Sequence, residues 1–282
     1  MAVVAFWGNC EKETGQTIST IAVATMMAIE HNFKILVMTT GFKDTTINES
    51  FWEPKKTSSM IQRELGIHGG IQSMESGIEG LSRVIQSNRG RTGLIPDYAK
   101  VVFKDRLDVL VPPRTKDYQE YLNIARTYPS IVALANTDYN MVLVDIDKRL
   151  PTDTQKEILE NADVIVITIN QGLTNVEKLV ELKRTNELFQ KDNTLVLIGK
   201  YDRYSKYNLK NIGRYLRERD PISAISYNTL FFESTTEGKV ADYFLRYRNL
   251  VDKNDRNSLF IEETRKTCSN IVSKIQSVQK RR

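Results

Sequence analysis

Short apolar runs alternate with longer amphipathic segments along almost the whole chain, and polar turns separate them. Runs of four to six apolar residues are typical of strands buried on both faces, and the longer segments have helical periodicity. The predicted strands are Val3–Phe6, Lys34–Met38, Leu107–Val111, Met141–Asp145, Val164–Ile169, Thr194–Ile198 and Ile222–Ile225. This alternation predicts an α/β fold with a doubly wound, mainly parallel sheet that carries helices on both faces.

Three helices are predicted between these strands. The segment Thr17–His31 is rich in alanine, methionine and isoleucine, which suits burial against a sheet. Asp153–Ala162 and Asn175–Gln190 are predicted as flanking helices. The segment 39–104 is less regular, because glycines and basic residues interrupt it, and we expect short helices joined by loops there.

The end of the chain, Phe244–Arg282, is predicted to finish in a helix. Its expected packing residues are Ile261, Ile271, Val272 and Ile275. Its expected solvent-facing residues are Lys266, Lys274, Lys280 and Arg281. With no repeat or low-complexity tract in the sequence, we expect one domain over 1–282, with 244–282 as a C-terminal helical segment that has a basic tail.

Composition narrows the class of protein. The 282 residues include 40% hydrophobic and 27% charged residues, enough apolar material for a large core. No apolar run reaches the length of a membrane span, and the first residues enter a strand without the features of a signal peptide, so we expect a cytoplasmic protein. The two cysteines and two histidines have no zinc-ligand spacing, which argues against a metal centre or a structural disulfide.

The net charge is +5, and the chain ends in Lys280-Arg281-Arg282. This bias allows attraction to nucleic acid or to an anionic surface. Charges of both signs alternate through most of the chain, however, and a solvated surface with a basic tail explains the same composition.

The most informative chemistry follows the first strand. A phosphate-binding P-loop has the pattern G-x-x-x-x-G-K-[ST], whose backbone N–H groups cradle phosphates and whose hydroxyl binds Mg²⁺. Here Gly15 and Thr17 occupy the last glycine and hydroxyl positions, whereas Cys10 replaces the first glycine and Gln16 replaces the lysine. The alternative is an ordinary strand-loop-helix turn, with Cys10 filling a tight turn.

Gln16 changes the chemistry that such a loop can perform. A glutamine can donate a hydrogen bond to a phosphate but brings no positive charge to phosphoryl transfer. Phosphate binding can therefore survive where fast hydrolysis does not. Lys12 is a candidate cation inside the loop, while Glu11 and Glu13 oppose a polyphosphate unless they point to solvent.

Asp145 closes the apolar run Met141–Asp145 and is therefore predicted at the carboxyl end of a buried strand. Ligands bind at that edge in open α/β sheets. The alternative is a carboxylate that caps a helix or orders a loop.

Taken together, the ordered segments resemble the ParA/MinD family of P-loop ATPases over nearly the whole chain. The stretch 138–147, DYNMVLVDID, is similar to the family's YDYVIIDTPP, and 161–167 is similar to its AADEVIIPV. The stretches 195–202, 225–229 and 237–240 resemble, in order, the strand that approaches the base, the IPYN step and the xEGKPV run. The segments 80–88 and 98–112 are similar to divergent members, TadZ/CpaE-like ones among them.

The departures from the family pattern concern catalysis. Glu11 occupies the position of the second lysine, which in the family reaches the nucleotide of the partner subunit. Thr39-Thr40-Gly41 replaces the D-x-D motif that orients water, unless Asp44 takes that role, and Gly199 replaces the asparagine that reads adenine. The resemblance therefore implies weak hydrolysis or none, and whether the chain is an ATPase stays open.

The resemblance also implies a set of site residues. Thr17 and Asp145 are expected to hold Mg²⁺, and Asp44 or Asp147 to orient the attacking water. The expected nucleotide-binding residues are Lys12, Glu13, Thr14, Gly15, Gln16, Thr17, Ile18, Lys200, Asp202, Tyr227 and Asn228.

Two clusters of charge have two interpretations each. Lys148 and Arg149 either compensate for the charge missing at Gln16 or lie on a surface loop before Pro151. The aromatic and basic residues of 201–207 suit either a nucleic-acid surface or a solvated loop beside the base.

The expected function is a dimeric, ATP- and Mg²⁺-binding switch for partition or positioning of DNA or of a secretion, pilus or conjugation assembly. Its expected partners are a second copy and a protein of that system. One alternative is a nucleotide-independent pseudo-ATPase scaffold for protein assembly. Another is a partition protein that binds DNA non-specifically through basic residues such as Arg214, Arg217, Arg219 and the 280–282 tail.

Overall fold

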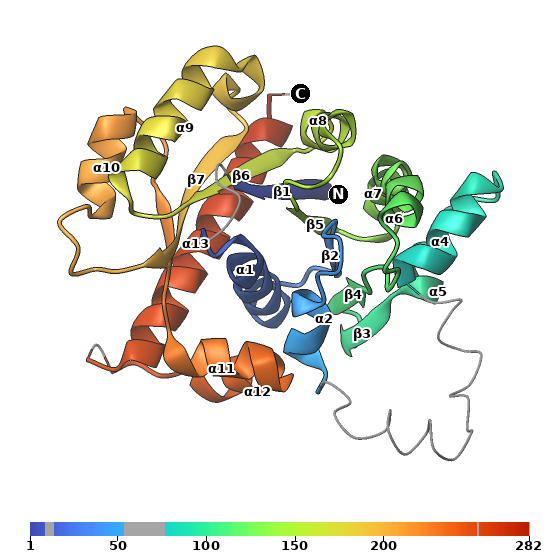
Figure 1. Ribbon diagram of the computed structural model, residues 1–282. Helices are drawn as coiled ribbons and strands as arrows, with labels where there is room; N and C mark the ends of the chain where they lie inside the picture. Colours follow the sequence, from blue (N-terminus) through green and yellow to red (C-terminus); the bar gives the residue numbers. More distant parts are fainter. Residues whose placement is uncertain (9–13, 54–76, 253, 282) are drawn as a thin grey trace.

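The computed structural model describes residues 1–8, 14–53, 77–252 and 254–281 (Figure 1). Its centre is an eight-stranded sheet in the order β3-β4-β2-β5-β1-β6-β7-β8. All neighbouring strands run parallel except β3 and β4. The strands are β1 (Ala2–Gly8), β2 (Ile35–Thr39), β3 (Lys100–Phe103), β4 (Leu107–Leu110), β5 (Met141–Ile146), β6 (Val164–Ile169), β7 (Thr194–Tyr201) and β8 (Ser223–Ser226). The predicted α/β fold with a mainly parallel sheet is confirmed.

All seven predicted strands are present, and β3 is the strand that the sequence did not predict. Three of its four residues are apolar, but Val101 is 55% exposed, so the strand is not buried on both faces as the interior strands are. It pairs antiparallel with β4 through a tight turn in which the Arg106 N–H donates to the Phe103 carbonyl at 3.0 Å. Its three consecutive apolar residues form a shorter run than the runs of four to six that indicate a buried strand.

One face of the sheet carries α1, α2, α11, α12 and α13 (Figure 1). These helices are α1 (Gln16–Glu30), α2 (Thr46–Phe51), α11 (Thr229–Glu237), α12 (Val240–Tyr247) and α13 (Arg256–Gln279). Val4 and Phe6 of β1 point into this layer, whereas Val3 and Ala5 point into the other. The alternation follows from the two-residue period of a strand. The helix predicted over Thr17–His31 is confirmed as α1, displaced by one residue.

The opposite face carries the remaining helices. They are α4 (Gly77–Gln86), α5 (Ile95–Tyr98), α6 (Tyr118–Ala125), α7 (Tyr128–Asp138), α8 (Thr152–Glu160), α9 (Leu173–Thr185), the 3₁₀ helix η2 (Glu187–Gln190) and α10 (Leu209–Leu216). The prediction of a single helix over Asn175–Gln190 was wrong. Asn186 interrupts it, because its side chain accepts a hydrogen bond from the Leu188 N–H at 3.0 Å and starts a new turn.

The C-terminal helix corrects a second prediction. Lys274 was expected to face solvent, but its side chain is 9% exposed and its ammonium lies 2.6 Å from the Asp220 carboxylate. The reason is that α13 packs along the edge strand β8, where Thr267 Oγ1 donates to the Ala224 carbonyl at 3.0 Å. α13 thus packs on one face of the sheet and also against its edge strand, and it buries positions that would be exposed if it packed on the face alone.

Candidate functional site

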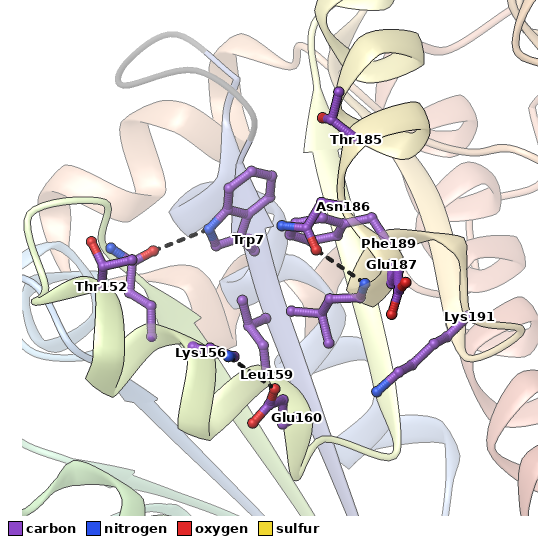
Figure 2. A pocket seen from close by; sticks show the side chains of 12 residues that line it. Trp7, Thr152, Lys156, Leu159, Glu160, Thr185, Asn186, Glu187, Phe189 and Lys191 are labelled. Atoms are coloured by element: carbon purple, nitrogen blue, oxygen red, sulfur yellow. Dashed lines mark hydrogen bonds and ion pairs between the residues drawn. The ribbon is translucent and has the colours of Figure 1, made fainter.

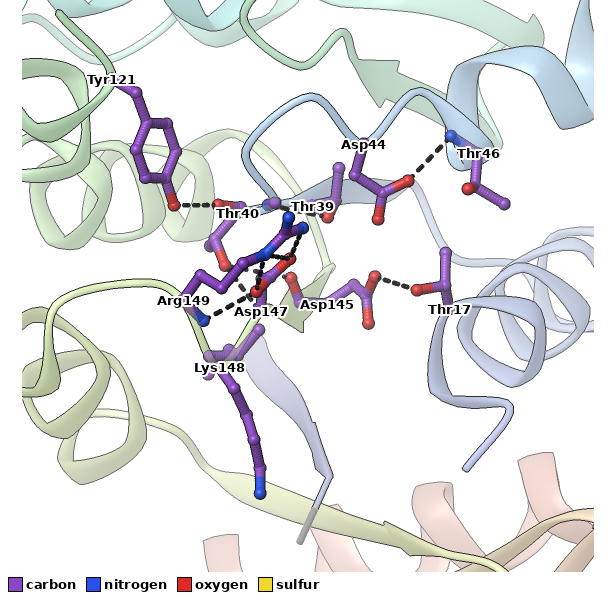
Figure 3. Close-up of polar contacts among 12 residues, drawn as sticks. Thr17, Thr39, Thr40, Asp44, Thr46, Tyr121, Asp145, Asp147, Lys148 and Arg149 are labelled. Carbon is purple, nitrogen blue, oxygen red and sulfur yellow. Dashed lines mark hydrogen bonds and ion pairs between the residues drawn. The ribbon is translucent and has the colours of Figure 1, made fainter. Parts of the chain in front are cut away.

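The carboxyl ends of β1, β5 and β2 lie side by side, and Asp145 of β5 faces Thr17 at the start of α1 (Figure 3). β5 lies between β1 and β2, and its Asp145 is in register with Phe6 of β1 and Thr39 of β2. The Thr40 N–H donates to the Asp145 carbonyl at 2.9 Å and extends this pairing beyond β2. Polar residues that follow the parallel strands therefore collect at one edge of the sheet.

Asp145 lies at the centre of this edge and is 2% exposed. Thr17 Oγ1 donates to its Oδ2 at 2.7 Å, and Gln16 Nε2 donates to its Oδ1 at 2.7 Å. Burial raises the pKa of Asp145 to about 7, against the two hydrogen bonds, which lower it; the nearby Asp44 and Asp147 raise it further. Neither side-chain partner carries a charge, so a buried carboxylate here is poorly stabilised. Asp145 is not the N-cap of the following helix α8, whose N-cap is Pro151.

The Gln16 amide occupies a nest of three acceptors. Its Nε2 lies 2.7 Å from Asp145 Oδ1, 2.9 Å from the Ile146 carbonyl and 3.1 Å from the Phe6 carbonyl. An amide nitrogen has two hydrogens to donate, whereas an ammonium has three. The surroundings of residue 16 therefore match the lysine of a P-loop better than they match glutamine.

The first turn of α1 faces the same place. Gly15 is in the left-handed region at φ 71°, and the described residues give α1 no side-chain cap and no acidic residue in its first turn. The N–H groups of that turn and the positive end of the helix dipole are therefore directed at the site. Such a terminus is suited to an anion.

Gly199 in β7 allows the backbone of Thr14, just before α1, to approach β7 closely. A Cβ at this position would lie 2.0 Å from the Thr14 carbonyl oxygen, so only glycine fits without moving the chain. The structure thus gives a steric reason for the glycine at the position where the family resemblance expects asparagine.

Asp44 and Asp147 both lie close to Gly41, and the charges of both act on Asp145. A Cβ placed on Gly41 would be 3.1 Å from Asp44 Oδ2 and 3.2 Å from Asp147 Oδ2. Asp44 Oδ1 also accepts a hydrogen bond from the Thr46 N–H at 3.0 Å. The structure therefore brings together both predicted water-orienting residues and the predicted metal ligand.

Lys148 and Arg149 point in different directions (Figure 3). Arg149 Nη2 lies 2.5 Å from Asp147 Oδ2, and its Nε lies 3.0 Å from Asp147 Oδ1. Burial alone would raise the pKa of Asp147, but the hydrogen bonds from Arg149 hold it below its ordinary value. The Lys148 ammonium lies instead 5.1 Å from the centre of the Trp7 ring. Of the two cations, Arg149 faces the site.

Tyr121 of α6 holds the chain that follows β2 at the site, and the sequence analysis did not predict it. Its hydroxyl donates to the Thr40 carbonyl at 2.6 Å, and the Asp147 N–H donates to Thr40 Oγ1 at 2.9 Å. Thr40 thus links α6 to the chain beyond β5. The tyrosine and the threonine are 81 positions apart, and no local pattern connects them.

The residues predicted to contact the base lie around a small cavity of about 20 Å³. Lys200, Tyr227 and Asn228 line it, together with Gly15 and Ile18. The Asn228 side chain is engaged as the N-cap of α11, because its Oδ1 accepts from the Phe231 N–H at 2.8 Å. The cavity offers little room for a base in this conformation.

Asp202 is not among the residues that line this cavity. Its backbone is tied to Gln171, whose Oε1 accepts from the Asp202 N–H at 2.7 Å. Its carboxylate accepts from the Tyr204 N–H at 2.9 Å and orders the loop after β7. The predicted residues Lys12 and Glu13, with Cys10 and Glu11, lie outside the described residues.

A larger cavity of about 460 Å³ lies between α8 and η2 (Figure 2). Trp7, at the end of β1, stacks on Phe189 with ring centres 4.7 Å apart. The Trp7 indole N–H also donates to Gln155 Oε1 at 3.2 Å. The sequence analysis did not identify this groove, because its walls come from segments that are distant in the chain.

Neither a membrane-spanning helix nor a cluster of metal-ligating side chains occurs in the part of the chain that the structure describes. No helix there has both the length and the apolar character needed to cross a membrane. Within the same residues, no three histidine, cysteine, aspartate or glutamate side chains are grouped to hold a metal ion. A cation at Thr17 and Asp145 would therefore need oxygens from water and from a ligand to complete its coordination.

No family model and no curated protein matches the chain. Among solved structures, a ParA family ATPase from Chlorobium tepidum TLS superposes with a TM-score of 0.69 at 16% identity, covering 95% of this chain and 97% of that one. MinD from Pyrococcus horikoshii OT3, complexed with Mg-ADP, gives a TM-score of 0.63 at 13% identity over 94% and 95% of the two chains. A Borrelia burgdorferi B31 protein, described as a plasmid partition protein and bound to AMPPNP, gives 0.55 at 16% identity over 98% of each.

These similarities extend over nearly full lengths at low identity, so they establish the fold. The chain has the fold of the ParA/MinD P-loop ATPases, as the sequence resemblance implied. The role of each site residue depends on the chain's own geometry.

Proposed function

We propose that this chain is a ParA/MinD-like switch that binds ATP with Mg²⁺ and hydrolyses it slowly or not at all. The observation that carries the proposal is the Thr17–Asp145 contact of 2.7 Å beside the uncapped start of α1. The Thr17 hydroxyl and the Asp145 carboxylate offer two oxygen ligands to a magnesium ion. The free N–H groups beside them can bind the phosphates that carry that ion. The solved structures with Mg-ADP and with AMPPNP support the choice of ligand.

Each residue has a separate task in this proposal. When bound, Mg²⁺ would supply a Lewis acid that neutralises phosphate charge. Thr17 and Asp145 would hold it, and the first N–H groups of α1 would orient the phosphates. The Asp145 carboxyl must lose its proton before it can hold a cation, and its raised pKa makes that loss a condition of binding near neutral pH.

Slow hydrolysis follows from the group at position 16. The Gln16 amide cannot neutralise charge that develops on the transferred phosphate. Its Nε2 is also engaged with the Asp145 carboxylate and two carbonyls, so a nucleotide must compete with those acceptors for it. Asp44 or Asp147 would orient the attacking water if turnover occurs.

A second function is favoured by the three acceptors around Gln16 and by the small cavity that Lys200, Tyr227 and Asn228 line. A Gln16 that stays on Asp145, together with a cavity of about 20 Å³, suits a nucleotide-independent scaffold that kept the fold as an interaction platform. This pseudo-ATPase would bind its partner protein equally well with and without ATP.

Calorimetric titration of ATP, ADP and a non-hydrolysable ATP analogue with Mg²⁺ separates the two functions. The variants are Thr17→Ala, which removes the hydroxyl, and Thr17→Ser, which keeps it as the matched control. The switch predicts binding that Thr17→Ala weakens about tenfold and Thr17→Ser preserves. Absence of binding to correctly folded wild-type protein would refute the switch and leave the scaffold.

Gln16→Lys tests the account of slow turnover. Because three acceptors already surround position 16, a lysine ammonium should fit the nest without rearrangement. We expect it to tighten ATP binding about tenfold or more and to raise the rate of phosphate release. An unchanged affinity and rate would show that the missing charge is not what limits this site.

Homodimerisation and a protein partner from a partition, secretion or conjugation system belong to the same proposal, and a partition protein that binds DNA non-specifically is the remaining alternative. Sedimentation with and without the ATP analogue tests the dimer. DNA binding that rests on phosphate contacts should weaken steeply between low and physiological salt, whereas a protein platform need not.

A further inference from the structure

Of the two cations that follow β5, Lys148 and Arg149, only Arg149 points toward the candidate site. Its guanidinium donates two hydrogen bonds to the Asp147 carboxylate, from Nε to Oδ1 at 3.0 Å and from Nη2 to Oδ2 at 2.5 Å. The neighbouring Lys148 extends the opposite way, toward Trp7 (Figure 3). Two adjacent cations thus have different surroundings, and one of them serves as a matched control for the other.

The Arg149–Asp147 pair is connected to the metal-binding edge by short steps. The Asp147 N–H donates to Thr40 Oγ1 at 2.9 Å, and the Thr40 N–H donates to the Asp145 carbonyl at 2.9 Å. Asp44 is close enough to influence the charge states of both Arg149 and Asp145. Asp147 directly follows β5 and Thr40 directly follows β2, so the guanidinium that Asp147 holds belongs to this edge of the sheet.

In the sheet order, β5 and β2 lie on one side of β1, whereas β7 and β8, whose ends border the cavity lined by Lys200 and Tyr227, lie on the other side. A phosphate held by the first turn of α1 lies beside Thr17, whose hydroxyl already contacts Asp145. A longer polyphosphate whose nucleoside lay on the side of β7 and β8 would continue from there toward the ends of β5 and β2. A third phosphate would then approach the place where Asp44, Asp147 and Arg149 meet, while a diphosphate would stop short of it.

Charge at the site favours this use of Arg149. Asp44 and Asp147 both lie next to Gly41, both are near enough to Asp145 for their charges to raise its pKa, and residue 16 contributes no positive charge. A triphosphate adds further negative charge, so it needs a cation that can turn toward it. The Arg149 side chain is 59% exposed and therefore has room to move, while Asp147 is 16% exposed and stays in place. A guanidinium binds carboxylate and phosphate oxygens with the same two-pronged geometry.

We propose that Arg149 binds the terminal phosphate of a nucleoside triphosphate in place of the lysine missing at position 16, and that Asp147 holds it while the phosphate is absent. This inference rests on the proposed nucleotide switch and deepens it, because it assigns the discrimination between triphosphate and diphosphate to one side chain. Asp147 then acts as an internal substitute for the phosphate. The two anions compete for one guanidinium.

The test is calorimetric titration of the non-hydrolysable ATP analogue and of ADP, each with Mg²⁺, into wild type, Arg149→Ala, Arg149→Lys and Lys148→Ala. We expect Arg149→Ala to lose about tenfold or more in affinity for the analogue and less than about threefold for ADP. Arg149→Lys should restore part of the loss, since it keeps the charge without the fork. Lys148→Ala should match wild type for both ligands.

Asp147→Asn adds a result that damage to the fold would not produce. Removing the competing charge releases Arg149, so affinity for the analogue should rise severalfold and affinity for ADP should change little. Equal losses for both ligands in Arg149→Ala, or no loss for either, would overturn the role of Arg149 while the nucleotide switch stands. Wild-type protein that binds neither ligand would instead refute the switch, and the role of Arg149 with it.

Discussion

Replacing Asp145 by asparagine should stabilise the protein, and the gain should grow as the pH rises. The carboxyl is 2% exposed, and its two side-chain partners, Gln16 and Thr17, are uncharged. An asparagine keeps an oxygen to accept from Gln16 and offers an N–H to the Thr17 hydroxyl, which can rotate to accept it. The substitution therefore keeps both contacts and removes the cost of ionising a buried acid.

The magnitude follows from the pKa of Asp145, which folding raises from 3.8 to about 7. Below the unfolded pKa both states hold the proton, and ionisation contributes nothing to the difference. Between the two values the unfolded chain releases the proton and the folded one keeps it, so stability falls by about 1.4 kcal/mol per pH unit. The loss is complete above the folded pKa, at about 4 kcal/mol over the full interval. From about pH 5 to about pH 8 the advantage of asparagine should increase by about 3 kcal/mol.

The assay is urea unfolding of wild type and Asp145→Asn in EDTA across that pH range, followed by circular dichroism. EDTA keeps divalent cations from stabilising the ionised carboxylate. The difference between the two unfolding free energies is the quantity to plot, because titrations elsewhere in the chain cancel in it. A difference that is flat with pH would refute the reasoning, since it would mean that folded Asp145 is ionised throughout.

Gln16→Lys provides the opposite control in the same experiment. An ammonium against Asp145 favours the ionised carboxylate and lowers its pKa, so this variant should gain stability relative to wild type as the pH rises. A wild-type pH dependence that Gln16→Lys leaves unaltered would place the titration on another group.

Two further substitutions test how the site is supported. Gly199→Ala places a methyl group 2.0 Å from the Thr14 carbonyl and should lower the unfolding free energy in urea by about 2 kcal/mol, whereas Gly213→Ala, with its nearest contact at 3.5 Å inside α10, should raise it by about 0.5 kcal/mol. Equal effects of the two would argue against the close approach. Asn228→Ala removes a buried N-cap and should cost about 2 kcal/mol in thermal or urea unfolding, against about 1 kcal/mol for the more exposed cap Asn208→Ala. A smaller loss at Asn228 would contradict the role we assign to its hydrogen bonds.

Much of the fold was predictable because its strands are buried on both faces. An interior strand must be largely apolar along its length, and this left an apolar run in the sequence for six of the seven strands that we predicted, whereas the seventh, β8, lies at the sheet edge. The same reasoning placed Asp145 at a strand end. β3 was not predicted because it is a short edge strand with only three consecutive apolar residues, and the break at Asn186 was not predicted because an apolar pattern continues across it.

The candidate site was predicted in its components and not in its contacts. The spacing of Gly15 and Thr17 located the start of α1, and the end of an apolar run located Asp145, because both signals are local. Which of Lys148 and Arg149 faces the site depends on the path of the loop after β5, and both have the same local pattern.

The sequence by itself determined the order of the elements, the edge of the sheet where polar residues gather, and the absence of charge at Gln16. Only the tertiary structure decided that Gln16 contacts three acceptors, that the Thr14 carbonyl approaches Gly199 too closely for a side chain, and that Arg149 pairs with Asp147. The physical reason is range. Strand burial and loop motifs act through neighbouring residues and mark the sequence, whereas the nest around Gln16 joins the ends of β1 and β5 to α1, and those segments become neighbours only when the sheet forms.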